Sequence, residues 1–116
     1  MNQESTLKED KITPVVVDLN AVKAGKVNEG GFLRMFGWAV ETILNKMFSG
    51  GTIPVSVKGS PSQVKSFAHT LGSEKRYLDS WKRFGLDDPR TYKNKAELNR
   101  AIVKFERLTG LSWPFD

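Results

Sequence analysis

Residues 32–48 limit how this chain can fold more than any other segment, because they form a helical pattern that is apolar on almost every side. Met35, Trp38 and Phe48 cover much of the surface that the main apolar stripe leaves free. The stripe has helical spacing and consists of Phe32, Leu33, Phe36, Val40, Ile43, Leu44 and Met47. A helix of this kind must be covered on most sides, whereas the small core of a 116-residue chain covers one side well. We therefore expect the other side to contact a partner subunit or to lie under the N-terminal segment.

A helix lying on a membrane surface is the third alternative. Such helices usually carry a strongly cationic polar face, and residues 32–48 do not. The sequence contains no apolar run near the roughly 20 residues that a membrane span needs, and residues 1–13 do not resemble a signal peptide. We expect no membrane partner. The absence of cysteine excludes disulfides and thiolate zinc sites and fits a reducing cytosol.

The rest of the chain predicts a mainly α, α+β fold in one small domain. Residues 31–116 form the globular helical domain, and residues 1–30 form an extended N-terminal arm without a periodic pattern of its own. Residues 53–58 alternate like a half-buried strand, and the β-branched run at 15–19 is a candidate partner strand. About four helices are predicted, at residues 32–48, 61–71, 74–84 and 95–109.

Capping signals mark the predicted helix ends. Ser60 with Gln63 forms a capping box before the helix at 61–71. Ser73 is a candidate cap for the helix at 74–84, and Asn94 is a candidate cap for the one at 95–109. Gly110 suits a left-handed C-terminal cap. The apolar tail with Trp113 and Phe115 is expected to pack back on the helices.

The net charge of +5 is placed in the C-terminal half. Residues 1–57 are balanced, whereas residues 58–108 carry twelve Lys/Arg against six Asp/Glu. A field of this sign favours phosphates or acidic protein surfaces. A solvated surface with no ligand explains the same excess.

Nothing in the sequence predicts an active site. His69 is the only histidine and has no cysteine ligand nearby in sequence. Asp87 and Asp88 precede Pro89 in a turn-rich segment and lack the further acidic ligands of a calcium loop. No phosphate-binding glycine motif and no nucleophile with a recognisable base are present. We expect no enzymatic activity, no catalytic residues, no metal and no cofactor.

Residues 62–84 resemble a helix-turn-helix motif. Ala68 is followed by Gly72, with Leu78 and Trp81 at the spacing of apolar residues in a second helix. That helix would enter the major groove of DNA. Its candidate nucleic-acid-binding residues are Ser73, Lys75, Arg76, Lys82 and Arg83. A pair of core helices packed against residues 95–109 explains the same apolar stripes.

Residues 55–115 resemble small uncharacterised proteins encoded by tailed bacteriophages, some of which are virion structural components. The resemblance is carried by FA at 67–68, EKRY at 74–77, GLDDPRTY at 85–92, FER at 105–107, TG at 109–110 and WPF at 113–115. It implies a capsid or tail accessory protein, located in the virion and in the host cytoplasm during assembly. It assigns no functional residue.

These observations favour a non-enzymatic structural or assembly protein that binds neighbouring subunits, including other copies of itself, through its arm and its apolar helix. The candidate protein-interface residues are Val15, Val17, Phe32, Met35, Phe36, Trp38, Ile43, Met47 and Phe48. The alternative is a small basic DNA-binding protein that uses the helix-turn-helix-like unit at 62–84. In either case the basic C-terminal half could contact nucleic acid.

Overall fold

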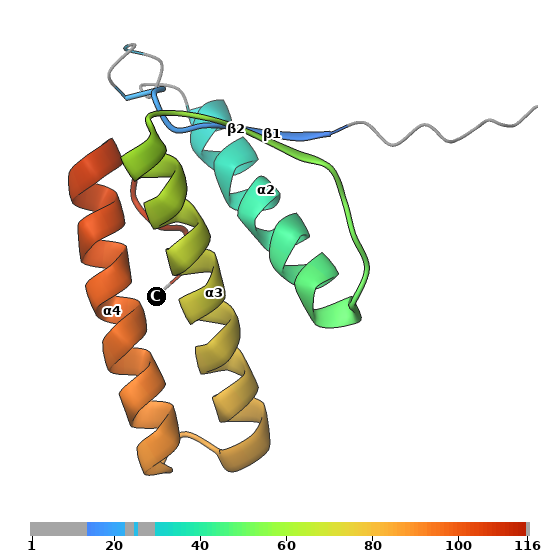
Figure 1. Ribbon diagram of the computed structural model, residues 1–116, viewed down its shortest axis with the longest axis vertical. Coiled ribbons are helices and arrows are strands. Elements are labelled where there is room, and N and C mark those ends of the chain that lie inside the picture. The colour runs from blue at the N-terminus through green and yellow to red at the C-terminus, as the bar shows by residue number, and fades with distance from the viewer. Residues whose placement is uncertain (1–13, 23–24, 26–29, 116) are drawn as a thin grey trace, which may run out of the picture.

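The computed structural model describes residues 14–22, 25 and 30–115. Along the chain these residues form β1 (Val15–Asp18), α2 (Gly30–Ser49), β2 (Val55–Lys58), α3 (Pro61–Phe84) and α4 (Pro89–Thr109). Figure 1 shows α3 and α4 side by side as an antiparallel hairpin, with α2 inclined along one side of it and the two strands near one end. The predicted mainly helical fold with a small β element is confirmed. The described part contains three helices rather than four.

The two strands are parallel neighbours, with Val15 opposite Val55 and Asp18 opposite Lys58. The predicted pairing of the two β segments is therefore confirmed. Val15 and Val17 point into the core while Val16 is exposed, as the alternation of a strand requires. Parallel pairing needs a crossover connection, and α2 lies within it.

The segment that follows β1 also belongs to the core, because Leu19 and Ala21 are fully buried. The prediction that residues 1–30 form an arm separate from the globular domain is therefore not matched over residues 15–21. The sequence shows no long periodic pattern here because a four-residue strand and a turn bury only alternate side chains. Residues 1–13, 23–24 and 26–29 of the predicted arm lie outside the described residues.

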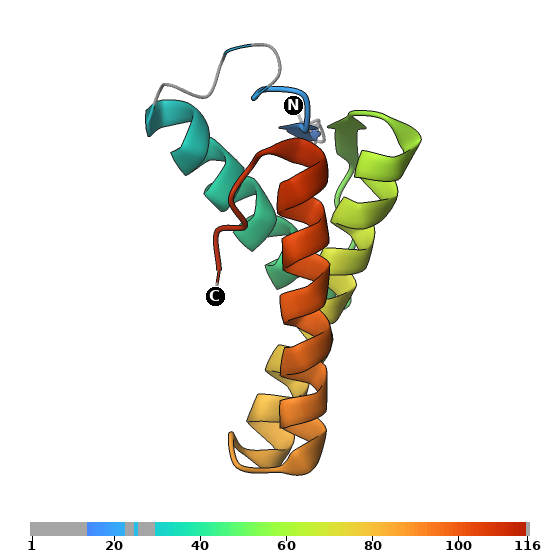
Figure 2. The same cartoon turned by 90° about the vertical axis from the view of Figure 1, so that its left-hand side faces the viewer.

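An aromatic cluster joins the three helices and the C-terminal segment. Phe105 of α4 is fully buried, and its ring centroid lies 6.1 Å from that of Phe36 in α2 and 6.0 Å from that of Phe67 in α3. The ring of Trp113 meets Phe105 edge-on at 5.3 Å, because the segment after α4 turns back toward α2 (Figure 2). Phe115 packs partly buried against the same core. The predicted return of the tail is confirmed.

Helix α3 is continuous, so the predicted break between residues 61–71 and 74–84 is wrong. Ser60 and Gln63 form the expected capping box at its start, and Gly85 follows its last residue. Ser73 is buried in mid-helix instead of acting as a cap. The apolar stripes of the two halves are in phase, since Phe67, Leu71 and Leu78 keep one helical face through Gly72. One glycine costs about 1 kcal/mol, which packing along a shared face readily offsets.

Helix α4 begins at Pro89, six residues before the predicted start at residue 95. Asp88 is its N-cap and accepts a hydrogen bond from the Arg90 backbone N–H at 2.9 Å. The Arg90 side chain donates to the same carboxylate, and this bond, together with the bond from the Arg90 backbone, lowers the pKa of Asp88 to about 2. The predicted cap Asn94 instead donates from its side chain to Ser80 of α3. The sequence favours a turn at Asp88-Pro89, although the same pair also suits an N-cap followed by the first helical residue.

Small side chains let α3 and α4 approach closely. Ser66, Ser73 and Ser80 recur every seventh residue and are all buried. The Thr70 hydroxyl donates to the Ser66 carbonyl at 2.8 Å and lies 3.4 Å from the Ala101 carbonyl of α4. The buried Thr70 hydroxyl is therefore hydrogen-bonded within the hairpin, as a buried polar group requires.

Replacing Gly72 by Ala tests the continuity of α3. A Cβ at Gly72 would meet only the Arg76 side chain at 3.6 Å, so Gly72→Ala should raise the free energy of unfolding by about 1 kcal/mol in urea denaturation. The matched control is Gly110→Ala, which should destabilise because Gly110 has φ +76° and its Cβ would lie 2.9 Å from Val22 Cγ1. A loss of stability in Gly72→Ala would indicate a turn at this position.

Candidate functional site

The outer face of α2 is the first candidate surface. Phe36, Val40 and Leu44 point into the core, whereas Met35 is 68% exposed and Trp38 is 58% exposed. Met35 and Trp38 adjoin along one helical face, and contiguous exposed apolar surface is a feature of interaction sites. The core of the described residues covers one side of α2, as the sequence predicted.

An uncharged row runs along this outer face. Its members are separated by alternating steps of four and three residues and are Gly31, Met35, Trp38, Thr42, Asn45 and Ser49. This 4-3 spacing places side chains along one line of a helix, as in the seam of a coiled coil. Arg34 and Glu41 flank the row on one side and Lys46 flanks it on the other, by the same helical geometry.

The structure separates the predicted interface residues into core and surface. Val15, Val17, Phe36 and Ile43 are buried in the core, so the folded domain does not present them to a partner. Phe32 and Met47 are partly buried against that core, and Phe48 is also partly exposed. Met35 and Trp38 alone among the nine lie on the outer row. Periodicity missed this division because a helix apolar on all sides does not indicate which side faces inward.

Phe48 lies at a groove between α2 and α3. The Lys75 ammonium is 5.3 Å and the Lys82 ammonium 4.8 Å from the centre of its ring, so both lysines of α3 lean toward α2. The groove has a volume of about 360 Å³, and its lining residues are Glu41, Leu44, Asn45, Phe48, Glu74, Tyr77, Leu78, Trp81 and Phe115.

The five residues predicted to bind nucleic acid do not form one surface. Ser73 is buried and accepts a hydrogen bond from Arg76 of the same helix, and Lys75 and Lys82 lie over Phe48 on the side of α2. Arg76 lies on a different side of α3, where it borders a groove with α4, and Arg83 is exposed. Because α3 has no turn at Gly72, the helix-turn-helix motif is not formed.

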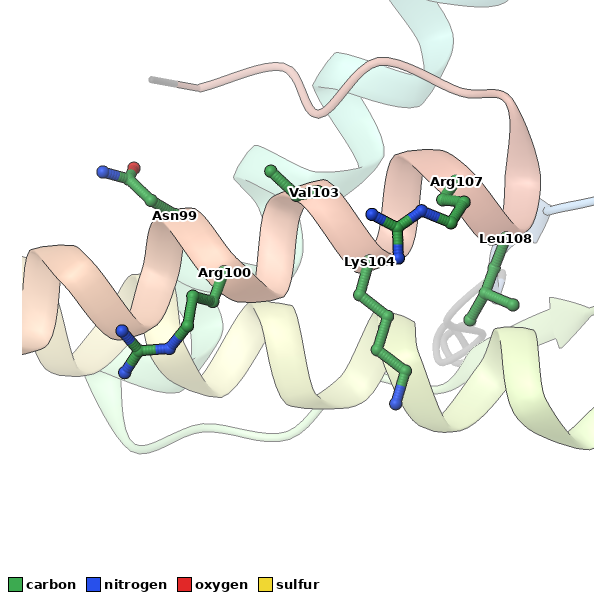
Figure 3. A pocket seen from close by; sticks show the side chains of 6 residues that line it. All are labelled: Asn99, Arg100, Val103, Lys104, Arg107 and Leu108. Atoms are coloured by element: carbon green, nitrogen blue, oxygen red, sulfur yellow. The ribbon is translucent and has the colours of Figure 1, made fainter.

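The second candidate surface is the basic groove, which we define as the groove between α3 and α4 together with the adjoining outer side of α4. Its cations are Lys65, Arg76, Arg100 and Lys104 in the groove and Arg107 on the side of α4. Three adjoining hollows share Lys104, and together they contain all five cations. Figure 3 shows Arg100, Lys104 and Leu108 extending to the same side of α4, with α2 behind that helix. The spacing of Arg100, Lys104 and Arg107 at i, i+4 and i+7 places the three cations on one face of a helix. A count of charges over the whole C-terminal half does not show this arrangement.

The charged side chains of the basic groove are almost all positive. Glu97 is the single carboxylate among its lining residues, and His69 lies between Lys65 and Arg76 along α3. Within residues 14–22, 25 and 30–115, none of the five cations forms an ion pair; the ion pairs there are Lys75–Asp79 and Arg90–Asp88. The groove therefore presents a concentrated positive field to solvent.

Glu74 is the one buried carboxylate among the described residues, with 2% of its surface exposed. Its Oε1 accepts a hydrogen bond from the Trp113 indole N–H at 2.9 Å. Burial raises its pKa above the usual value, although the bond from Trp113 and the charge of Lys95 act in the opposite direction. The Glu74–Trp113 bond connects the middle of α3 to the C-terminal segment, so we assign it a structural role.

No group of three or more potential metal ligands occurs in the described part of the chain. The described helices include none long and apolar enough to cross a membrane. Comparison with protein-family models, with curated proteins and with solved structures found no match.

The raised pKa of Glu74 predicts a stability change with pH. The folded protein holds this proton more tightly than the unfolded chain, so the contribution of Glu74 to the free energy of unfolding is largest below the unfolded pKa and falls as pH rises through the folded pKa. Glu74→Gln removes that titration. In urea denaturation, the free energy of unfolding of the variant should rise relative to that of the parent as the pH increases from about 4 to 7.

Trp113→Phe provides a second measurement, because it removes the indole donor and leaves the carboxylate buried. Its stability should fall more steeply with pH than that of the parent. A difference between Glu74→Gln and the parent that stays constant from pH 4 to pH 7 would contradict the raised pKa.

Proposed function

We propose that this protein is a non-enzymatic structural or assembly protein whose copies associate through the outer face of α2. The observation that carries the proposal is the exposure of Met35 and Trp38 on a row without charged residues. Exposed apolar surface of this kind costs solubility unless a partner covers it. A tryptophan is also the side chain most often found at the energetic centre of an interface.

The charged residues beside this face are complementary to those of a second copy of the same chain. Arg34 and Glu41 are seven residues apart and flank the row on the same side. When two copies of α2 pack antiparallel about a twofold axis, Arg34 of each copy can lie opposite Glu41 of the other. Trp38 then lies near the axis beside its own counterpart, and Met35 of each copy lies beside Trp38 of the other.

The expected association is weak for an isolated pair. A 20-residue helix is about 30 Å long, and one helical face is smaller than the roughly 800 Å² per partner of a standard interface. Flanking ion pairs add little, because exposed pairs contribute at most about 1 kcal/mol. Such a contact suits a subunit that is held in a larger assembly by several weak interactions.

The identity of that assembly rests on the resemblance to tailed-phage proteins alone. It favours a virion component that accumulates in the host cytoplasm during assembly. The alternative of a regulator that binds DNA through a helix-turn-helix loses its basis, because α3 is one continuous helix.

Trp38→Asp combined with Met35→Asp should abolish self-association, because two carboxylates would be desolvated in the contact. Sedimentation equilibrium from about 1 to about 100 μM covers the expected affinity range. Trp81→Asp is the matched control, since Trp81 is a similarly exposed tryptophan outside the row, and it should associate like the parent. A parent that remains monomeric throughout this range would overturn the proposal.

Charge exchange on the flank tests the antiparallel arrangement. Arg34→Glu or Glu41→Arg alone should weaken the dimer severalfold by placing like charges opposite each other. The double variant should recover the affinity of the parent, because it restores both pairs with reversed polarity. A parallel pair places Glu41 near Lys46 of the other copy, and in that case the double variant would show no recovery.

A further inference from the structure

The basic groove lies on the side of the α3–α4 hairpin away from α2, so association through α2 leaves it open. We propose that the basic groove binds the phosphate backbone of duplex DNA without reading its base sequence. The site differs from the helix-turn-helix prediction in position and in chemistry: of the residues predicted there, only Arg76 lines it.

The spacing of the cations suits a run of phosphates. Lys65 and Arg76 are eleven residues apart on α3, which is about 16 Å along a helix, and Arg100 and Arg107 are about 10 Å apart along α4. Each strand of a duplex carries one phosphate per 3.4 Å of helix axis. The two rows of the groove can therefore contact several phosphates at once, without any change in the backbone of the hairpin.

The cations are available for such contacts. Lys65, Lys104 and Arg107 are exposed and form no ion pair within the described residues. Lys75 and Arg90, by contrast, are paired with Asp79 at 3.2 Å and with Asp88 at 2.9 Å. Binding of phosphates to unpaired cations releases the counterions of the DNA, which is the main source of sequence-independent affinity.

The lining of the groove favours a duplex over a single strand. Proteins that hold single strands stack the bases on aromatic side chains, and no Phe, Tyr or Trp lines this groove. Its neutral polar groups, such as Ser62 and Asn99, can donate hydrogen bonds to phosphate oxygens. Its apolar part consists of small or aliphatic side chains, including Ala101 and Leu108.

The test is a titration of a duplex of about 20 base pairs with the full chain, followed by fluorescence anisotropy between about 25 and 200 mM salt. With five cations in contact, the logarithm of the association constant should fall with the logarithm of the salt concentration with a slope of up to about −4.5. A parent that does not bind the duplex at the lowest salt concentration would overturn the proposal.

Lys65→Gln combined with Lys104→Gln should reduce the affinity at low salt about tenfold and the steepness of the slope by about two. The control, Lys46→Gln combined with Lys82→Gln, removes the same charge from two exposed lysines outside the groove. It should change the affinity less than threefold, by loss of net charge alone. Equal losses in the two double variants would overturn the assignment to this groove.

Three further measurements test the sign and the chemistry of the site. Glu97→Gln removes the single carboxylate of the groove and should strengthen binding two- to threefold, whereas Asp87→Asn in the loop before α4 should not; equal effects would count against the groove. A single strand of the same length should bind more weakly than the duplex. Poly-glutamate binding as tightly as the duplex would overturn recognition of phosphates.

Discussion

The rest of the structure depends on the contacts of the Phe105 ring. The ring meets Phe36 of α2, Phe67 of α3 and Trp113 of the C-terminal segment, and it is fully buried. A chain of this size builds one such cluster, so each helix turns one face toward it. The outer face of α2 and the far side of the α3–α4 hairpin face solvent, and both candidate sites lie on them.

The buried Glu74 shows how the C-terminal segment is fixed over this cluster. Taking a carboxylate out of water costs free energy, and a single indole donor compensates only part of that cost, as the raised pKa indicates. If the tail shifted along the helices, the Trp113 indole N–H would no longer reach Glu74. The Trp113 backbone N–H also donates to Glu106 at 2.8 Å. The arrangement therefore selects one placement of the tail at some expense in stability.

The sequence predicted the caps at the start of α3 and the end of α4, the pairing of the two strands and the return of the tail, but it did not predict the continuity of α3. Ser60, Gln63 and Gly110 act as the caps that their types favour, because capping depends on residues a few positions apart. The continuity of α3 depends on whether the apolar stripes before and after Gly72 lie on the same helical face. Gly72 suggested a turn between them instead. The burial of Leu19 depends on packing against distant segments, and no local pattern reports it. The basic groove likewise combines residues of two helices that are far apart in the sequence, such as Lys65 and Lys104.

The placement of the two candidate surfaces has a geometric consequence for their combined use. The basic groove lies on one side of the hairpin and α2 on the other, so a twofold dimer through α2 would carry its two grooves on its outer sides. Grooves that face away from each other are poorly placed to contact one stretch of a straight duplex. They are well placed to hold two separate duplexes. Because two linked weak sites bind more tightly than one when both are engaged, such a dimer would bind neighbouring duplexes more tightly than a single isolated duplex.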